Sequence, residues 1–411
     1  GANDDPNYAI RPYNNFYYIP QSELHGQFDM KGSATEPYKE CPAKATGNNR
    51  FDAYPNITDW YETVKLNYGV DYQNGGTCHY YPTPDTWTKL LDILLFWADK
   101  NIDGFRCDMA EMVPVEFWEW VIPQVKEKYP DLLFIAEVYN PAEYQNYIFR
   151  GKFDYLYDKV GLYDTLRNVI CGYDSATAIT RSWQSLGGIE KRMLNFLENH
   201  DEQRIASDFF AGNPRKAIPG LIVSACMNTN PMMIYFGQEF GELGMDSEGF
   251  SGRDGRTTIF DYWSVDTIRR WRNGGKFDGK MLTEDQKHIY SIYQRILTLC
   301  NKEKAITEGE FFDLMYANAN GWRFNEHKQY TFLRKAGKEL LFIIVNFDHI
   351  SVDVAINVPS HAFDFLQIPQ MDIYPAVDLL TGKTESISLL PYKATEVSVE
   401  RNSRKIINIV L

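Results

Sequence analysis

The sequence predicts an α/β protein in which a parallel sheet is covered by helices, followed by an antiparallel β domain. Between residues 85 and 304, short apolar stretches alternate with segments of helical periodicity, which is typical of parallel strands joined by helical crossovers. From 305 to 411 the pattern changes to β-branched, alternating runs, typical of antiparallel strands. Residues 1–84 are rich in Asn, Tyr, Pro and Gly and lack strong periodicity, which predicts an irregular lobe.

The composition excludes several classes of partner. The chain has 411 residues, 44% of them hydrophobic, and a formal net charge of −13. A protein this acidic has no broad basic field for a polyanion, so we expect no nucleic-acid partner. Its apolar runs are shorter than a membrane span, so we also expect no membrane partner.

The six cysteines form no C-x-x-C pair, so we predict no metal site built on cysteine. Cys107 and Cys226 stand in apolar surroundings and are expected to be buried thiols. Cys41 and Cys78 share a loop-rich region and could pair in an oxidising compartment. The compartment stays open, with a secreted or periplasmic location favoured over a cytoplasmic one.

The helical segments follow in order from residue 85. The first, 85–101, begins at Asp85 as a candidate N-cap and places apolar residues on one face: Trp87, Leu90, Leu91, Leu94 and Leu95. The second, 114–129, has Pro114 near its start and a kink expected at Pro123.

Three later helices are expected at about 174–184, 214–228 and 283–300. The last of them has a plausible capping box, formed by Thr283 with Gln286.

Five candidate strands lie between these helices: 102–111, 132–140, 153–161, 193–202 and 231–241. Several of them run from apolar residues directly into ionisable ones. In a (β/α) barrel the carboxyl ends of the strands are where an active site is built. The architecture therefore gives a reason for the polar ends of these strands.

Three strand ends carry a carboxylate: Asp108 in "DGFRCDMAE", Glu137 in "LFIAEVYN" and Asp201 in "FLENHDE". They are separated by about one and about two βα units, so each is expected at the same level on a different strand. Crowded carboxylates destabilise an unliganded protein, which favours a chemical role over a structural one.

Glycoside hydrolysis needs two carboxyl groups, one to attack or stabilise the anomeric carbon and one to protonate the leaving oxygen. Arg106 lies two residues before Asp108 and therefore points to the same side of the strand. Its guanidinium can hold Asp108 as a carboxylate. Glu137 follows a buried apolar run, which makes it the better candidate for the acid.

The segments "GFRCD", "IAEVY" and "ENHD" resemble three motifs of the α-amylase family, glycoside hydrolase family 13, and "IYFGQEFG" resembles its last barrel strand. The resemblance covers roughly residues 85–262. It implies a barrel of which strands four to eight lie in this chain, an inserted lobe, and a C-terminal antiparallel β domain. It also implies that Asp108 is the nucleophile, Glu137 the general acid/base and Asp201 a third catalytic carboxylate, which binds sugar hydroxyls and favours the distorted transition state.

The same resemblance implies that Arg106 and His200 contact the substrate, and we add Asn199 and Tyr139 to the expected substrate-binding set. Taken singly, each has a plainer interpretation: Arg106 with Asp108 as a structural ion pair, His200 as a hydrogen-bonded structural histidine. Tyr139, Phe16, Tyr17 and Tyr18 could stack on sugar rings, although packing is the safer expectation for any one of 27 tyrosines.

Two departures from the family pattern stand out. Glu111 and Met112 occupy positions where many members that cut internal α-1,4 bonds have a Lys-His pair. The sequence therefore does not decide whether the family's structural calcium site is present. The chemistry itself is expected to need no cofactor. The family's first motif and first three βα units are absent, so we expect an N-terminal segment or a second polypeptide to complete the barrel.

The main functional prediction is a retaining hydrolase of α-glucosidic bonds, with α-1,4 bonds favoured, in starch- or glycogen-type glucans or malto-oligosaccharides. A glucanotransferase with the same catalytic residues and a non-catalytic glucan-binding chain remain alternatives. The glycine-rich loop 247–263 has no Walker spacing, so it is not expected to bind phosphate, and it should shape access to the site.

Overall fold

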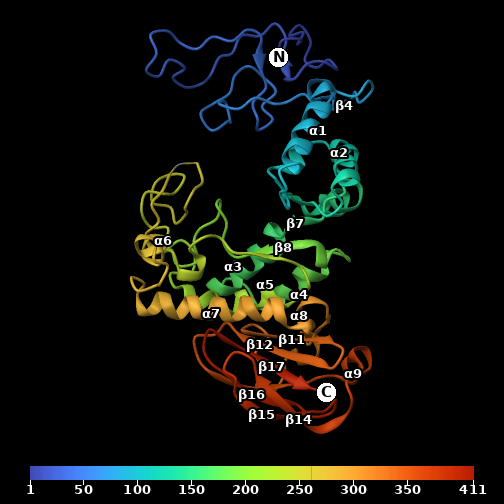
Figure 1. The fold of residues 1–411 in the computed structure, drawn as a ribbon, viewed down its shortest axis with the longest axis vertical. Helices are drawn as coiled ribbons and strands as arrows, with labels where there is room; N and C mark the ends of the chain where they lie inside the picture. The colour runs from blue at the N-terminus through green and yellow to red at the C-terminus, as the bar shows by residue number, and fades with distance from the viewer. Residues whose placement is uncertain (261) are drawn as a thin grey trace. The chain divides into compact units, whose positions relative to one another are not determined.

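The computed structural model describes residues 1–260 and 262–411; Asp261, in the predicted loop 247–263, lies outside the described residues. The chain forms two compact units, Gly1–Leu156 and Tyr157–Leu411. Figure 1 traces them from the blue N-terminus to the red C-terminus. The boundaries predicted for the three parts of the chain, 1–84, 85–304 and 305–411, remain predictions.

The first part of the chain has little regular structure, as predicted. Its strands pair in twos and have two residues each: β1 (Tyr18–Ile19) with β2 (Ala43–Lys44), and β3 (Val70–Asp71) with β4 (Thr77–Cys78). A single-turn helix, η1 (Tyr72–Asn74), lies between β3 and β4.

A small aromatic core holds this lobe together. The Tyr17 ring is 1% exposed and meets Phe51 edge-on, with ring centroids 5.1 Å apart. Its hydroxyl donates to Asp71 at 3.1 Å. Tyr17 and Tyr18 are both buried, so packing is the interpretation that holds for these two side chains.

Helices and parallel strands then alternate, as predicted: α1 (Asp85–Ala98), β5 (Gly104–Cys107), η2 (Ala110–Met112), α2 (Val115–Lys128), β6 (Leu133–Ala136), η3 (Pro141–Glu143), η4 (Asn146–Arg150) and β7 (Tyr155–Tyr157). β5 pairs with β6 in parallel, with Gly104 opposite Leu133 and Cys107 opposite Ala136. β6 pairs in parallel with β7.

The first helix corrects one prediction. Pro84 occupies the N-cap position of α1, no side chain caps the helix, and Asp85 is its first residue. The Asp85 carboxylate instead forms an ion pair with Lys89 one turn later, at 2.5 Å. A helix can begin directly after proline because the fixed φ of that residue already suits the turn. The second helix, α2, contains Pro123 and continues to Lys128.

In the second unit, helices again alternate with strands: η5 (Lys159–Tyr163), α3 (Asp164–Cys171), α4 (Thr177–Gln184), η6 (Glu190–Arg192), β8 (Met193–Phe196), η7 (Pro214–Ala217), α5 (Ile218–Cys226), β9 (Met232–Met233), η8 (Gln238–Phe240), α6 (Asp266–Arg272), η9 (Asn273–Gly275), α7 (Glu284–Lys302) and α8 (Lys304–Thr307). β8 and β9 are parallel. The capping box of Thr283 and Gln286 at the start of α7 is confirmed.

The C-terminal region is antiparallel, as predicted. Its strands are β10 (Glu310–Asp313), β11 (Gln329–Ala336), β12 (Glu339–Asn346), β13 (Val352–Ile356), β14 (Met371–Asp378), β15 (Thr384–Leu389), β16 (Thr395–Val399) and β17 (Ser403–Val410), with η10 (Met315–Asn318) and α9 (Ser360–Leu366) between them. Six strands form one sheet in the order β10-β11-β12-β17-β14-β15, and β13 pairs with β16. The helix α5 packs against β12 and β17 of this sheet, and the long helix α7 packs against α5.

One arginine joins the C-terminal sheet to the helices beside it. Arg334 on β11 is 0% exposed. Its guanidinium donates to the carbonyl of Met227 at the end of α5 at 2.6 Å. It also donates to three carbonyls in and after α8, those of Ala305, Ile306 and Gly309, at 2.8–2.9 Å. The buried cation thus satisfies carbonyl groups that a helix end leaves without a partner.

No helix among the described residues is long and apolar enough to cross a bilayer. All six cysteines are free in the structure, with Cys41 and Cys78 exposed and unpaired to each other. Cys107 and Cys226 are buried, as predicted.

Asp158 is a buried carboxylate at the first turn after β7. It is 2% exposed, and its side chain accepts a hydrogen bond from the Leu162 backbone N–H at 2.7 Å. Burial raises the pKa of Asp158 from 3.8 to about 6. The folded protein therefore holds a proton on this group between about pH 4 and pH 6 that the unfolded chain has already released.

We predict that Arg334→Met lowers the free energy of unfolding by about 3–5 kcal/mol, because four buried carbonyls lose their donor. Urea unfolding followed by circular dichroism measures this change. Lys335→Met, at the next position on β11, is the matched control and should change the midpoint little. Equal midpoints for the two variants would contradict the role assigned to Arg334.

A second prediction concerns pH. Because the folded pKa of Asp158 lies above the unfolded value, this group favours folding at low pH, and its contribution is lost as the pH rises from about 4 to above 6. In Asp158→Asn the stability lost between pH 4 and pH 7 should shrink by on the order of 2–3 kcal/mol. Thermal unfolding at several pH values tests this, with the exposed Asp208→Asn as control; parallel curves for wild type and Asp158→Asn would refute it.

Candidate active site

Asp108 and Glu137 directly follow two paired parallel strands. Cys107 at the end of β5 lies opposite Ala136 at the end of β6. The ladder continues one step further, because the Glu137 backbone N–H donates to the Cys107 carbonyl at 3.1 Å. The two carboxylates therefore leave the sheet at the same level, as the sequence predicts.

The guanidinium of Arg106 contacts both carboxylates. Its Nη2 lies 3.0 Å from Glu137 Oε1, and its Nη1 donates to Asp108 Oδ1. The two acids differ in exposure: the Asp108 side chain is 74% exposed and that of Glu137 only 3%. One carboxylate is thus open to a ligand, while the other is enclosed by protein.

Glu137 is held from two further sides. The Met109 backbone N–H donates to its Oε2 at 2.9 Å, and the Tyr139 hydroxyl donates to its Oε1 at 2.7 Å. Met109 has φ = 44°, a left-handed conformation that is uncommon for a residue with a side chain. The tight turn after Asp108 brings this amide back to the neighbouring strand end.

Glu111 links the two loops that follow these strands. Its Oε2 accepts hydrogen bonds from the backbone N–H groups of Tyr139 at 3.2 Å and Asn140 at 3.0 Å. In the sequence Glu111 stands out only as a departure from the family pattern, and its hydrogen bonds to the loop after β6 were not predicted. An acid three residues after a candidate nucleophile was the available signal.

In the second unit, the end of β8 forms a compact turn. Asn199 is 1% exposed, and its Oδ1 accepts from the backbone N–H groups of Asp201 and Glu202, both at 2.9 Å. His200 Nε2 lies 3.2 Å from Asp201 Oδ2. The asparagine fixes the turn, and the turn presents His200 and Asp201 together.

A buried ion pair lies beneath this turn. Glu198 Oε2 accepts from Arg204 Nη1 at 2.9 Å, and both side chains are at most 1% exposed. Arg204 also donates to the Phe236 carbonyl at 2.9 Å and to Thr257 Oγ1 at 3.1 Å. The pair therefore ties the turn after β8 to the segment after β9 and to the glycine-rich loop.

The glycine-rich loop also binds this turn directly. Arg256 Nε donates to the Asp201 backbone carbonyl at 2.6 Å, and Arg256 Nη1 pairs with Asp254 Oδ2 at 3.2 Å. Sequence reasoning missed Glu198, Arg204 and Arg256. The signal for the first two was a carboxylate and an arginine at the two ends of the polar segment 198–204, which directly follows an apolar strand.

The structure thus groups the predicted residues in two sets. Arg106, Asp108, Glu137 and Tyr139 come together in the first unit, and Asn199, His200 and Asp201 in the second. The approach of the second set to the first stays a prediction.

Among residues 1–260 and 262–411, no group of three or more His, Cys, Asp or Glu side chains is arranged to hold a metal ion. The expected option of a structural calcium ion stays a prediction.

Comparison with known proteins places the chain. The profile of the alpha-amylase catalytic domain matches residues 79–309. The chain is 35% identical over 92 residues to the alpha-1,4-glucan:maltose-1-phosphate maltosyltransferase of Cereibacter sphaeroides, a match that covers 21% of this chain and 16% of that protein. It is 25% identical over 247 residues to alpha-amylase 3 of Dictyoglomus thermophilum, which covers 56% of this chain and 48% of that protein.

Among solved structures, an Anoxybacillus alpha-amylase is similar with a TM-score of 0.58 and 18% identity, covering 81% of this chain and 64% of that one. The chain thus spans less than two thirds of the length of each of these relatives. The structural likeness confirms the predicted barrel class with a C-terminal antiparallel sheet. Because the catalytic-domain profile extends over more than half of its residues, the chain belongs to the alpha-amylase family, glycoside hydrolase family 13.

Proposed function

We propose that the chain carries the chemistry of a retaining glycoside hydrolase acting on α-glucosidic bonds, α-1,4 bonds first, of starch- or glycogen-type glucans and malto-oligosaccharides. Membership of the alpha-amylase family supports this proposal. The likeness to an alpha-amylase of Dictyoglomus thermophilum supports it as well.

The observation that carries the proposal is the pair of carboxylates on one guanidinium. Asp108 and Glu137 both contact Arg106, so their carboxyl groups are close neighbours. Retaining glycosidases need a separation of about 5 Å, whereas inverting enzymes need roughly 6.5–9.5 Å to admit a water molecule. A pair that shares one arginine is compatible with the shorter separation, and the family resemblance implies the retaining mechanism that uses it.

The difference in exposure suggests the division of roles. Asp108, the open carboxylate, attacks the anomeric carbon and forms the glycosyl–enzyme ester. Glu137, the enclosed carboxyl, gives its proton to the departing glycosidic oxygen. In the second step Glu137 takes a proton from water, whose oxygen displaces Asp108 from the sugar.

Arg106 supports the same division by its charge. Its guanidinium offsets the negative charge of Asp108 and orients that carboxylate. We further propose that His200 and Asp201 serve the sugar hydroxyls, as the family motifs imply, and that Asn199 and Tyr139 contribute to substrate binding. The backbone turn held by Asn199 and Arg256 supports a fixed position for Asp201.

Transfer to a sugar acceptor is the second candidate function. The match to a maltosyltransferase of Cereibacter sphaeroides favours it. Both reactions share the glycosyl–enzyme ester and differ only in whether water or a sugar hydroxyl resolves it.

We predict that Asp108→Asn and Glu137→Gln each lower turnover of a chromogenic maltoside by on the order of 10³-fold or more, because each removes a group that reacts in the transition state. The exposed neighbours Asp103→Asn and Glu127→Gln are the matched controls and should keep wild-type rates. Circular dichroism verifies that all four variants are folded.

Retained activity in Asp108→Asn would remove the assignment of the nucleophile. A wild-type chain that binds maltoside without turnover would instead favour the glucan-binding alternative.

The two catalytic candidates are separated by their products from maltotriose. Hydrolysis should yield only shorter sugars, because water resolves the ester, and chromatography of the products measures this. Oligosaccharides longer than maltotriose would show that a sugar acceptor competes with water, and the hydrolase proposal would give way to the transferase.

A further inference from the structure

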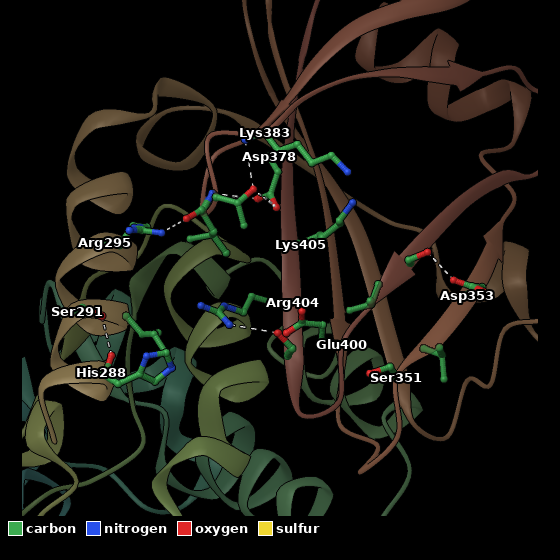
Figure 2. Close-up of a pocket in the computed structure, with 17 residues that line it drawn as sticks. His288, Ser291, Arg295, Ser351, Asp353, Asp378, Lys383, Glu400, Arg404 and Lys405 are labelled. Atoms are coloured by element: carbon green, nitrogen blue, oxygen red, sulfur yellow. Dashed lines mark hydrogen bonds between the residues drawn. The ribbon is translucent and has the colours of Figure 1, made fainter. Parts of the chain in front are cut away.

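A cavity of about 780 Å³ lies between α7 and the C-terminal strands of the second unit. His288 and Arg295, two turns apart on α7, line one side, and Asp378, Lys383 and Arg404 line the other. Figure 2 shows Arg404 reaching from the sheet toward the helix that carries His288. The cavity belongs to neither of the two residue sets described above.

Arg404 is incompletely satisfied in this cavity. Its Nη1 donates to Ser403 Oγ at 3.2 Å, but its Nε is buried and has no hydrogen-bond partner within the described part of the chain. Burial lowers the pKa of Arg404, so the charged guanidinium lacks full compensation in its surroundings. A buried charged donor without an acceptor is costly, and such groups in native proteins point to a bound water or ion.

The acids that line the cavity are largely engaged elsewhere. The Asp378 carboxylate accepts from the Leu380 backbone N–H at 3.0 Å and from Thr381 Oγ1 at 2.8 Å. Asp353 accepts from Ser398 Oγ and lies 3.7 Å from Arg323, outside the cavity. The third acid, Glu400, is exposed and offsets part of the charge on Arg404 from the solvent side.

The basic side chains that line the cavity have fewer acidic partners. Lys383 forms no ion pair within the described residues, and Arg295 donates to a neutral acceptor, the Leu380 carbonyl. Lys405 pairs with Glu385 at 3.3 Å. Arg295, Lys383 and Arg404 therefore present positive charge that Asp378 and Glu400 balance only in part.

From this arrangement we infer that the cavity is a binding site for a phosphate group, held by Arg404 with Lys383, Arg295 and His288 around it. Guanidinium and ammonium groups are the donors that phosphate oxygens take, and Arg404, Arg295 and Lys383 line the cavity from separate elements. The acceptor that Arg404 Nε lacks is supplied by one of those oxygens.

The rest of the lining suits a polyhydroxylated ester of phosphate. Hydroxyl groups surround the basic residues: Ser291, Ser351, Thr381, Ser398 and Ser403. The cavity also has room for more than one inorganic ion. Free phosphate and a sugar phosphate share the charged group, and binding measurements distinguish them.

Isothermal titration of the full chain at constant ionic strength tests the site with three probes: inorganic phosphate, glucose 6-phosphate and glucose. We expect saturable binding of phosphate, and binding of glucose 6-phosphate at least as tight. A tighter ester would identify an esterified ligand, and equal affinities would identify free phosphate. Absence of binding by both phosphate compounds would overturn the proposal.

Variants locate the binding. Arg404→Gln should weaken phosphate binding by roughly ten-fold or more, the effect of losing a charge-assisted hydrogen bond. The double variant Lys383→Gln/His288→Gln, which changes only exposed side chains, should weaken it similarly and decides the matter if Arg404→Gln does not fold. Arg401→Gln is the control, because it removes the same charge from an exposed position outside the cavity lining. It should alter the phosphate affinity by less than about two-fold. A loss of affinity equal to that of Arg404→Gln would show that only net charge matters and would contradict the proposed site.

Discussion

The contact of one guanidinium with two carboxylates is the interaction on which the candidate active site depends. Asp108 and Glu137 would repel each other at adjacent strand ends without a cation between them. Arg106 supplies that cation from within β5 itself. Because alternate residues of a strand share one face, the arginine two positions before Asp108 is already directed to the correct side.

The same physical solution recurs at the core of the second unit. Arg204 joins three loops around Glu198, and Arg334 joins the helices α5 and α8 to β11 through carbonyl groups alone. In both cases the planar, multiply donating guanidinium satisfies acceptors that converge from separate segments. A buried aliphatic side chain would pack there but would leave those acceptors unpaired.

Hydrogen bonds made by the residues that follow the strands explain how short strands can support a site. β5, β6 and β8 have four residues each, and the residues that follow them are held by side-chain and backbone hydrogen bonds. Asn199 closes the turn before Asp201, and Met109 closes the turn after Asp108. The strands determine where the polar residues begin, and the hydrogen bonds determine how they are oriented.

Much of this could be predicted from local patterns. Apolar stretches located all five parallel strands, and their polar ends located Asp108 and Glu137, because side-chain periodicity and strand length are local properties. Capping at Thr283 was predicted for the same reason. The cap expected at Asp85 was wrong, since a proline before it starts the helix equally well, and α3 was not predicted from its eight residues.

The sequence by itself therefore determined the order of strands and helices, the antiparallel end of the chain and the positions of the acids at strand ends. Only the tertiary structure decided which donors each acid receives. Glu111 bonding to the loop of Asn140, Arg256 to Asp201 and Arg334 to Met227 all join residues far apart in the chain. Such pairs depend on strand register and helix packing, which no local pattern of residues encodes.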